Sequence, residues 1–182
     1  ILREVRLSEM TGKVKATFDE NGIPYVLLKG AVIRPLYPAP WMRTSCDADV
    51  LIHEKDLDRA IALLTAAGFT TKGERDYHDV SLYYGYTHLE LHFNICENDE
   101  KLDRMLSKVW DYTLPGKQSE QRMTSAFFLF HHTAHAAYHF IRGGCGVKPL
   151  LDLYILRQCG FYDENELLPL LEQSDLVPFY RA

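Results

Sequence analysis

The chain has 182 residues, of which 47% are hydrophobic and 25% are charged, and its formal net charge is -5. This is the composition of an ordinary globular protein that is long enough to bury a core of its own. The acidic balance argues against a protein whose main task is to grip a nucleic acid backbone. No apolar run approaches the roughly 18 residues of a membrane span and no signal peptide is visible, so we expect a cytoplasmic protein.

The four cysteines lie far apart and include no Cys-x-x-Cys pair. They indicate neither a disulfide framework nor a zinc knuckle, and we expect reduced thiols. These cysteines are Cys46, Cys96, Cys145 and Cys159. The chain begins at Ile1 without Met and ends at Ala182 just after a helical pattern, so we expect it to be the ordered part of a longer protein.

The first predicted elements are a helix, a short strand and a second helix. Apolar residues recur with helical spacing over residues 2–21, and a Gly-containing stop follows. Residues 25–28 form an apolar strand, and Gly30 lets the backbone turn tightly into a helix over residues 31–36. Pro35 falls inside this helix and marks its end.

Two aspartates open the next apolar run, which extends from Asp47 to Ile52. Side chains alternate between the two faces of a strand, so Asp47 and Asp49 point the same way. Their carboxylates repel each other, and a hard cation such as Mg²⁺ would neutralise the pair through oxygen ligands. The alternative is a pair of solvated aspartates at the entrance of a strand. Because the pair is repulsive, we expect Asp→Asn at either position to leave the fold intact.

The following elements predict an α/β arrangement. Residues 55–68 form an amphipathic helix, residues 69–71 a strand, and residues 80–84 and 87–95 a β-hairpin. On the second hairpin strand, one face is apolar and the other is polar. The polar face carries His88, Glu90 and His92. It is either the edge of a site or an exposed strand face.

The second half of the chain is helical. Helices are predicted over residues 102–110, 125–141 and 149–159 and from Glu164 onward, with a loop around Pro115-Gly116. We therefore expect an α/β domain over residues 1–98 and a helical subdomain over residues 99–182, which is truncated at its C-terminus.

Three histidines share one face of the predicted helix over residues 125–141, because His131, His135 and His139 recur every four residues. Such spacing occurs in zinc-binding helices. Three interpretations remain open: a packed helix whose histidines hydrogen-bond to neighbours such as Asp152, a face that lines a cleft, and a separate metal site.

One run of residues resembles a known family. It consists of an apolar strand that ends in Lys29-Gly30, then Arg43, and then Asp47-x-Asp49 with an apolar tail. This pattern resembles the nucleotidyltransferase superfamily of the polymerase-beta type, and within it most closely the uncharacterised bacterial group labelled "nucleotidyltransferase family protein". Members usually carry Gly-Ser or Gly-Gly at the first turn, whereas this chain has Gly30-Ala31.

The resemblance implies a fold, a reaction and a site. The fold is a nucleotidyltransferase-like mixed sheet with flanking helices, of the α/β (α+β) class. The reaction moves a nucleoside monophosphate from a nucleoside triphosphate, with ATP expected, to a small-molecule or protein acceptor, with Mg²⁺ or Mn²⁺ as cofactor and nucleic acid disfavoured as a partner. The implied catalytic and metal-binding residues are Asp47, Asp49 and Glu90. The implied nucleotide-binding residues are Lys29, Gly30 and Arg43. The implied cleft-lining residues are His92, His135, His139 and Asp152.

Two other functions remain open from the residues. The absence of a hydroxyl after Gly30 is compatible with a degenerate nucleotide-binding or interaction module on the same fold. The dipeptide His78-Asp79, with His53 and Asp152, imitates the ligands of a His/Asp metallophosphohydrolase, but residues 76–84 are predicted as turn and strand rather than helix. Metal preference distinguishes these functions: Mg²⁺ or Mn²⁺ for the transferase, zinc or iron for the hydrolase, and none for the module.

Overall fold

The computed structural model describes residues 2–72, 75–160 and 162–182. Two compact units are present. Unit 1 comprises Ile1–Ile95 with Pro115–Arg122, and unit 2 comprises Cys96–Leu114 with Met123–Ala182. The predicted domain limits, 1–98 and 99–182, stay a prediction.

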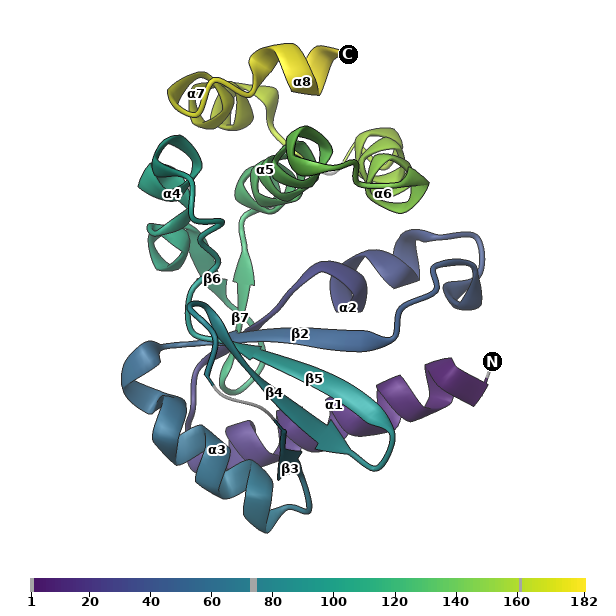
Figure 1. The fold of residues 1–182 in the computed structure, drawn as a ribbon, viewed down its shortest axis with the longest axis vertical. Helices are drawn as coiled ribbons and strands as arrows, with labels where there is room; N and C mark the ends of the chain where they lie inside the picture. Colours follow the sequence, from purple (N-terminus) through teal and green to yellow (C-terminus); the bar gives the residue numbers. More distant parts are fainter. Residues whose placement is uncertain (1, 73–74, 161) are drawn as a thin grey trace. The chain divides into compact units, whose positions relative to one another are not determined.

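A mixed sheet of seven strands organises the α/β half of the chain (Figure 1). Its strands are β1 (Tyr25–Leu27), β2 (Asp47–Ile52), β3 (Thr70–Thr71), β4 (Asp79–Tyr84), β5 (Thr87–His92), β6 (Thr113–Pro115) and β7 (Glu120–Met123), in the spatial order β3-β4-β5-β2-β1-β7-β6. β2 runs parallel to β5 and antiparallel to β1. The predicted mixed sheet and hairpin are thereby confirmed.

The core of unit 1 lies on one face of this sheet. Helices α1 (Leu2–Asn21) and α3 (Leu57–Ala66) cover that face, and α2 (Lys29–Ile33) lies on the other side (Figure 1). Burial follows the predicted periodicities, with every fourth or third residue of α1 and alternate residues of β2 and β5 turned inward. The core residues of these elements are Leu7, Met10, Val14, Phe18, Ala48, Val50, Ile52, Leu57, Ala60, Leu64, Leu89 and Leu91. The opposite face of β2 and β5 is therefore the one left for polar side chains.

The short helix after β1 differs from its prediction. α2 begins at Lys29 rather than Ala31 and ends at Ile33, where a 3₁₀ turn over Arg34–Leu36 continues it. Pro35 stands in the first turn of that 3₁₀ segment, where its missing N–H is not needed. The prediction that Pro35 ends the α-helical geometry is thus confirmed, with the end placed two residues earlier.

The loop predicted around Pro115-Gly116 is present as a turn over residues 116–119, but it joins two strands that were not predicted, β6 and β7, which form a hairpin. The Gly116 N–H donates to the Glu120 carbonyl at 2.8 Å, and β7 pairs in parallel with β1. The sequence of β7, Glu120–Met123, is mostly polar and lacks the apolar alternation that predicts strands. Pairing with β1, rather than local preference, makes this segment a strand.

Unit 2 is helical. Its α-helices are α4 (Glu100–Leu106), α5 (Ser125–Arg142), α6 (Val147–Gln158), α7 (Glu164–Gln173) and α8 (Val177–Arg181). α5 packs against α6, α7 and α8, and α4 packs against α7. The Thr124 hydroxyl caps α5 by accepting from the Phe127 N–H at 3.3 Å. α8 was not predicted. Within residues 2–72, 75–160 and 162–182, no helix is both long and apolar enough to cross a membrane.

Candidate active site

Three carboxylates meet on the polar face of β2 and β5. In the parallel register of these strands, Asp47 lies opposite His88, Asp49 opposite Glu90, and Leu51 opposite His92. Paired residues of neighbouring strands point to the same face, and the intervening residues of both strands lie in the core. The structure therefore brings Asp47, Asp49 and Glu90 together, as the sequence predicted of their faces.

Asp49 is the buried member of the three, with 4% of its surface exposed. Its Oδ1 lies 2.9 Å from Lys29 Nζ and 3.4 Å from His92 Nε2. Burial by itself raises the pKa of a carboxyl, but the Lys29 ammonium and the hydrogen bond from His92 outweigh burial and hold the pKa of Asp49 well below its usual range. Asp49 is therefore ionised at neutral pH.

The buried His92 ring contacts two of the carboxylates. The ring is 3% exposed, and its Nε2 lies 3.4 Å from Asp49 Oδ1 and 3.4 Å from Glu90 Oε2. Burial lowers the pKa of an imidazole, but the hydrogen bonds to Asp49 and Glu90 reverse this and raise the pKa of His92. Placed this way, His92 holds Asp49 and Glu90 in fixed relative positions.

The donor atoms on this face fit a divalent cation. Two sets of side chains each have ligand atoms within 4.8 Å of one another: Asp47, His88 and Glu90, and Asp49, Glu90 and His92. Glu90 belongs to both sets, so one carboxylate can be shared between two neighbouring ions. The three carboxylates supply the oxygen ligands that Mg²⁺ and Mn²⁺ prefer.

Lys29 reaches this face from an unusual backbone position. It opens α2 with φ 38°, in the left-handed region that non-glycine residues seldom occupy. The Leu28 N–H just before it donates to the Asp49 carbonyl at 3.0 Å, so the turn is fixed to β2. A strained backbone conformation persists where surrounding contacts hold it in place. Here this conformation places the Lys29 ammonium beside Asp49.

The turn glycine lies against a neighbouring side chain. A Cβ on Gly30 would lie 2.5 Å from Arg43 Nη1 and 3.5 Å from Ser45 Oγ. Arg43 itself is 5% exposed. The space beside Gly30 is therefore occupied by the guanidinium of Arg43.

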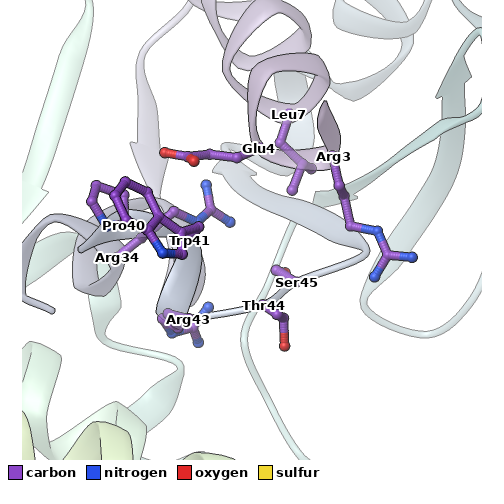
Figure 2. Close-up of a pocket in the computed structure, with 9 residues that line it drawn as sticks. All are labelled: Arg3, Glu4, Leu7, Arg34, Pro40, Trp41, Arg43, Thr44 and Ser45. Atoms are coloured by element: carbon purple, nitrogen blue, oxygen red, sulfur yellow. The ribbon is translucent and has the colours of Figure 1, made fainter. Parts of the chain in front are cut away.

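A small pocket of about 50 Å³ adjoins this turn, and Figure 2 shows the residues around it. Its lining is rich in arginine and consists of Arg3, Glu4, Leu7, Arg34, Pro40, Trp41, Arg43, Thr44 and Ser45. Burial, together with the charge of Arg43, lowers the pKa of Arg34. The concentration of guanidinium groups favours an anionic ligand.

Sequence reasoning missed Ser45 and Arg34. The Ser45 hydroxyl donates to Asp47 Oδ1 at 2.6 Å and so orients the more exposed of the two aspartates. The available signal for Ser45 was its position two residues before Asp47, on the same face of an extended chain. Arg34 follows Gly30 by one helical turn, which is the spacing that could have drawn attention to it.

The remaining predicted residues lie in unit 2. Asp152 is buried beside His132, whose Nε2 lies 3.4 Å from Asp152 Oδ2, so one histidine of this helix makes the expected contact with Asp152. His135 Nδ1 lies 2.6 Å from Glu97 Oε1, and His139 is exposed one turn further on. That these residues line a cleft stays a prediction.

The hydrolase dipeptide lies at the start of a strand, not in a helix. His78 Nε2 and Asp79 Oδ2 are 3.0 Å apart, and Asp79 is the first residue of β4. In the described part of the chain, these two residues form a possible metal-binding set with His92, and His53 is not in it. The predicted ligand set of a His/Asp metallophosphohydrolase is therefore not the set that this face assembles.

A family model described as "Uncharacterised nucleotidyltransferase" matches residues 1–181. This match confirms the resemblance carried by Lys29-Gly30 and the Asp-x-Asp pair. A search of curated proteins found no match.

Solved structures share the fold. The solution structure of the antibiotic-resistance factor ANT(2'')-Ia has a TM-score of 0.68 at 10% identity, covering 98% of this chain and 95% of that chain. The crystal structure of ANT(2'')-Ia in complex with adenylyl-2''-tobramycin has a TM-score of 0.63 at 12% identity, covering 95% and 99%. An antigenic nucleotidyltransferase-like protein from Paracoccidioides brasiliensis has a TM-score of 0.53 at 16% identity, covering 95% and 92%. The predicted nucleotidyltransferase-like fold is confirmed.

Proposed function

The chain belongs to the uncharacterised nucleotidyltransferase family, and we propose that it transfers a nucleoside monophosphate from a nucleoside triphosphate to a small-molecule or protein acceptor. We propose Asp47, Asp49 and Glu90 as the catalytic and metal-binding residues. Lys29, Gly30 and Arg43 form the proposed nucleotide-binding turn.

One observation carries this proposal. Asp49 and Glu90 are register partners on parallel strands, and Asp47 lies on the same face one pleat away. Three carboxylates are thus concentrated where a cationic turn, Lys29 to Arg43, meets the sheet. A solvated strand face gives no reason for burying Asp49 beside an ammonium and a histidine.

Asp47, Asp49 and Glu90 would hold the Mg²⁺ or Mn²⁺ ions through their carboxylate oxygens. When bound, such ions would neutralise charge on the attacking and leaving oxygens of the phosphoryl group. Lys29 already neutralises part of the Asp49 charge, and Ser45 and His92 hold Asp47 and Asp49 in place. The chain therefore supplies orientation, on which phosphoryl transfer mainly depends.

The chemical step proceeds at the α-phosphorus of the triphosphate. The acceptor oxygen forms a bond to this phosphorus while the bond to the bridging oxygen of the β-phosphate breaks, so pyrophosphate leaves. The acceptor proton passes to Glu90, the catalytic carboxylate that lies opposite Asp49 and keeps 27% of its side chain exposed. Arg43 and Lys29 balance the negative charge of the departing phosphates.

The acceptor class follows from charge and from likeness of fold. The net charge of -5 disfavours a polynucleotide acceptor. ANT(2'')-Ia, which shares the fold, is described in complex with adenylyl-2''-tobramycin, a nucleotide joined to a small molecule. These points support ATP as donor and a small molecule, or a protein side chain, as acceptor.

The test is nucleotide binding by calorimetry with ATP, GTP, CTP and UTP, each with and without Mg²⁺. We expect metal-dependent binding of ATP that the double variant Asp47→Asn, Asp49→Asn loses. A matched control is Asp56→Asn, Asp58→Asn, which removes the same charge outside the site and should bind ATP like the wild type.

Either of two results would refute the proposal. One is the absence of binding for every triphosphate in the presence of Mg²⁺ or Mn²⁺. The other is equal ATP binding by the two double variants, which would show that Asp47 and Asp49 are not part of the nucleotide site.

A further inference from the structure

We propose that unit 2 holds a metal site built from its own residues, in which Glu97, His135 and His139 bind a divalent transition metal of the zinc class. All three residues belong to unit 2. Each offers one ligand atom, and these atoms lie within 4.8 Å of one another.

The three side chains already converge. His135 Nδ1 lies 2.6 Å from Glu97 Oε1, and the rings of His135 and His139 have centroids 4.5 Å apart in an edge-to-face arrangement. In a tetrahedral zinc site with bonds of about 2.0–2.1 Å, ligand atoms stand roughly 3.4 Å apart. The observed separations, from 2.6 Å between His135 and Glu97 to at most 4.8 Å within the set, bracket that spacing.

The helix supplies two ligands in a favourable position. His135 and His139 are one turn apart on α5, which is the spacing of a zinc-binding helix. His139 lies in the last turn of α5, where the helix dipole favours a cation. His139 is exposed, so a metal ion can enter from solvent.

The backbone around the third ligand, Glu97, is fixed by hydrogen bonds. Glu97 is buried, and its N–H donates to Asp103 Oδ1 at 2.7 Å. Asp103 also accepts from the Asp99 N–H at 3.1 Å, and Asp99 caps α4. The segment before α4 is thus fixed, and it presents a carboxylate to α5 without a large ordering cost on binding.

The donor set selects the metal. Two imidazoles and one carboxylate suit zinc and the neighbouring transition metals, whereas Mg²⁺ prefers oxygen ligands. With three protein ligands, one coordination position is left for water.

Binding would tie the segment before α4 to α5. A ligand that binds only the folded state stabilises it by mass action. The site therefore gives unit 2 a metal-dependent stability that does not depend on the proposed transfer reaction.

The test is titration with Co²⁺ and Zn²⁺ in the presence of excess Mg²⁺, which occupies the carboxylates of unit 1. Co²⁺ reports ligand type and geometry through its visible absorption. We expect a tetrahedral Co²⁺ spectrum, displaced by Zn²⁺, and an affinity about a hundredfold weaker in His139→Ala, because a direct ligand is lost. His139 is exposed, so this variant keeps its fold, which circular dichroism verifies.

A matched control is His53→Ala, which removes a histidine outside every possible metal set of the described residues. It should bind Co²⁺ like the wild type, and Zn²⁺ should raise the unfolding temperature of both proteins but not that of His139→Ala. Glu97→Gln should weaken binding at least about tenfold. Equal Co²⁺ affinity in His139→Ala and His53→Ala, or no tetrahedral spectrum in the wild type, would overturn the proposal while leaving the proposed transferase untouched.

Discussion

The ammonium of Lys29 lies 2.9 Å from Asp49 Oδ1, and the pair is shielded from solvent at the start of α2. Asp47, one pleat away on the same face, instead accepts a hydrogen bond from the Ser45 hydroxyl at 2.6 Å. The two aspartates of the Asp-x-Asp pair therefore have different surroundings. One balances a buried charge, and the other is held by a neutral donor.

This difference predicts unequal effects on stability. Asp49→Asn should lower the free energy of unfolding by about 1 to 3 kcal/mol, because it leaves the Lys29 ammonium without its counter-charge. Asp47→Asn should change it by less than about 0.5 kcal/mol, since an amide oxygen still accepts from Ser45. Urea denaturation of both variants measures the difference. Equal stabilities of the two variants would contradict this difference and would support the expectation from the sequence, in which the two carboxylates only repel each other.

Glu90 should matter for turnover but not for folding. It is half-buried and has imidazoles rather than a buried cation beside it. Glu90→Gln keeps the size of the side chain but removes the proton acceptor, so we expect kcat to fall at least about a hundredfold with the unfolding temperature nearly unchanged. Glu20→Gln, an exposed change on α1, is the control. Unchanged turnover in Glu90→Gln would show that Glu90 is a surface residue without a role in catalysis.

Gly30 and Arg43 should act as one unit in nucleotide binding. An added Cβ at Gly30 would displace the end of the Arg43 side chain, which can move at little cost to the fold. We expect Gly30→Ala and Arg43→Ala each to weaken ATP binding roughly tenfold, and the double variant to be no worse than Arg43→Ala. Calorimetry on the four proteins of this cycle gives the coupling. Additive losses would show that Gly30 serves the nucleotide directly.

Glu120 should make unit 1 sensitive to acid. Burial alone raises the pKa of this carboxyl, but Lys15 at 2.8 Å and Arg122 at 3.0 Å outweigh burial and lower the pKa. A lowered pKa in the folded state means that the stabilisation is complete above the unfolded value of about 4.3 and is lost as the pH falls through the folded value.

The corresponding variant is Glu120→Gln. At pH 7 it should be less stable than the wild type by on the order of 1 kcal/mol, since the two cations are partly exposed and screened. At pH 3 the difference should shrink. Denaturation at both pH values measures it, with Glu20→Gln as an exposed control. A difference that does not depend on pH would contradict the assignment.

The sequence predicted those parts of the site that depend on periodicity. Alternation along the first strand placed Asp47 and Asp49 on one of its faces. Alternation along the second strand placed His88, Glu90 and His92 on one of its faces. In the structure these two strand faces form one face of the sheet, because β2 and β5 are neighbours in register. The resemblance to the nucleotidyltransferase superfamily predicted the mixed sheet. Local rules were sufficient wherever burial follows one repeating pattern.

What the sequence could not predict depends on contacts between distant segments. The strand β7 is polar and forms through pairing with β1, so no local pattern indicated it. The pairing of Lys29 with Asp49 joins positions on two elements, and the space above Gly30 is filled by a side chain from the loop before β2. Such contacts are set by tertiary packing rather than by local preference.

The parallel register of β2 and β5 also governs when the site can form. Asp49 and Glu90 are partners across 90 - 49 = 41 positions of sequence, and the helix α3 and the β4 strand must be built between them. Closing such a long loop costs conformational entropy before the contact between the strands contributes any favourable free energy. The pairing therefore belongs to the slow, non-local part of folding. During synthesis, Asp47 and Asp49 leave the ribosome well before β5 exists, so they gain Glu90 and His92 as neighbours only when β5 has been made and docks beside them.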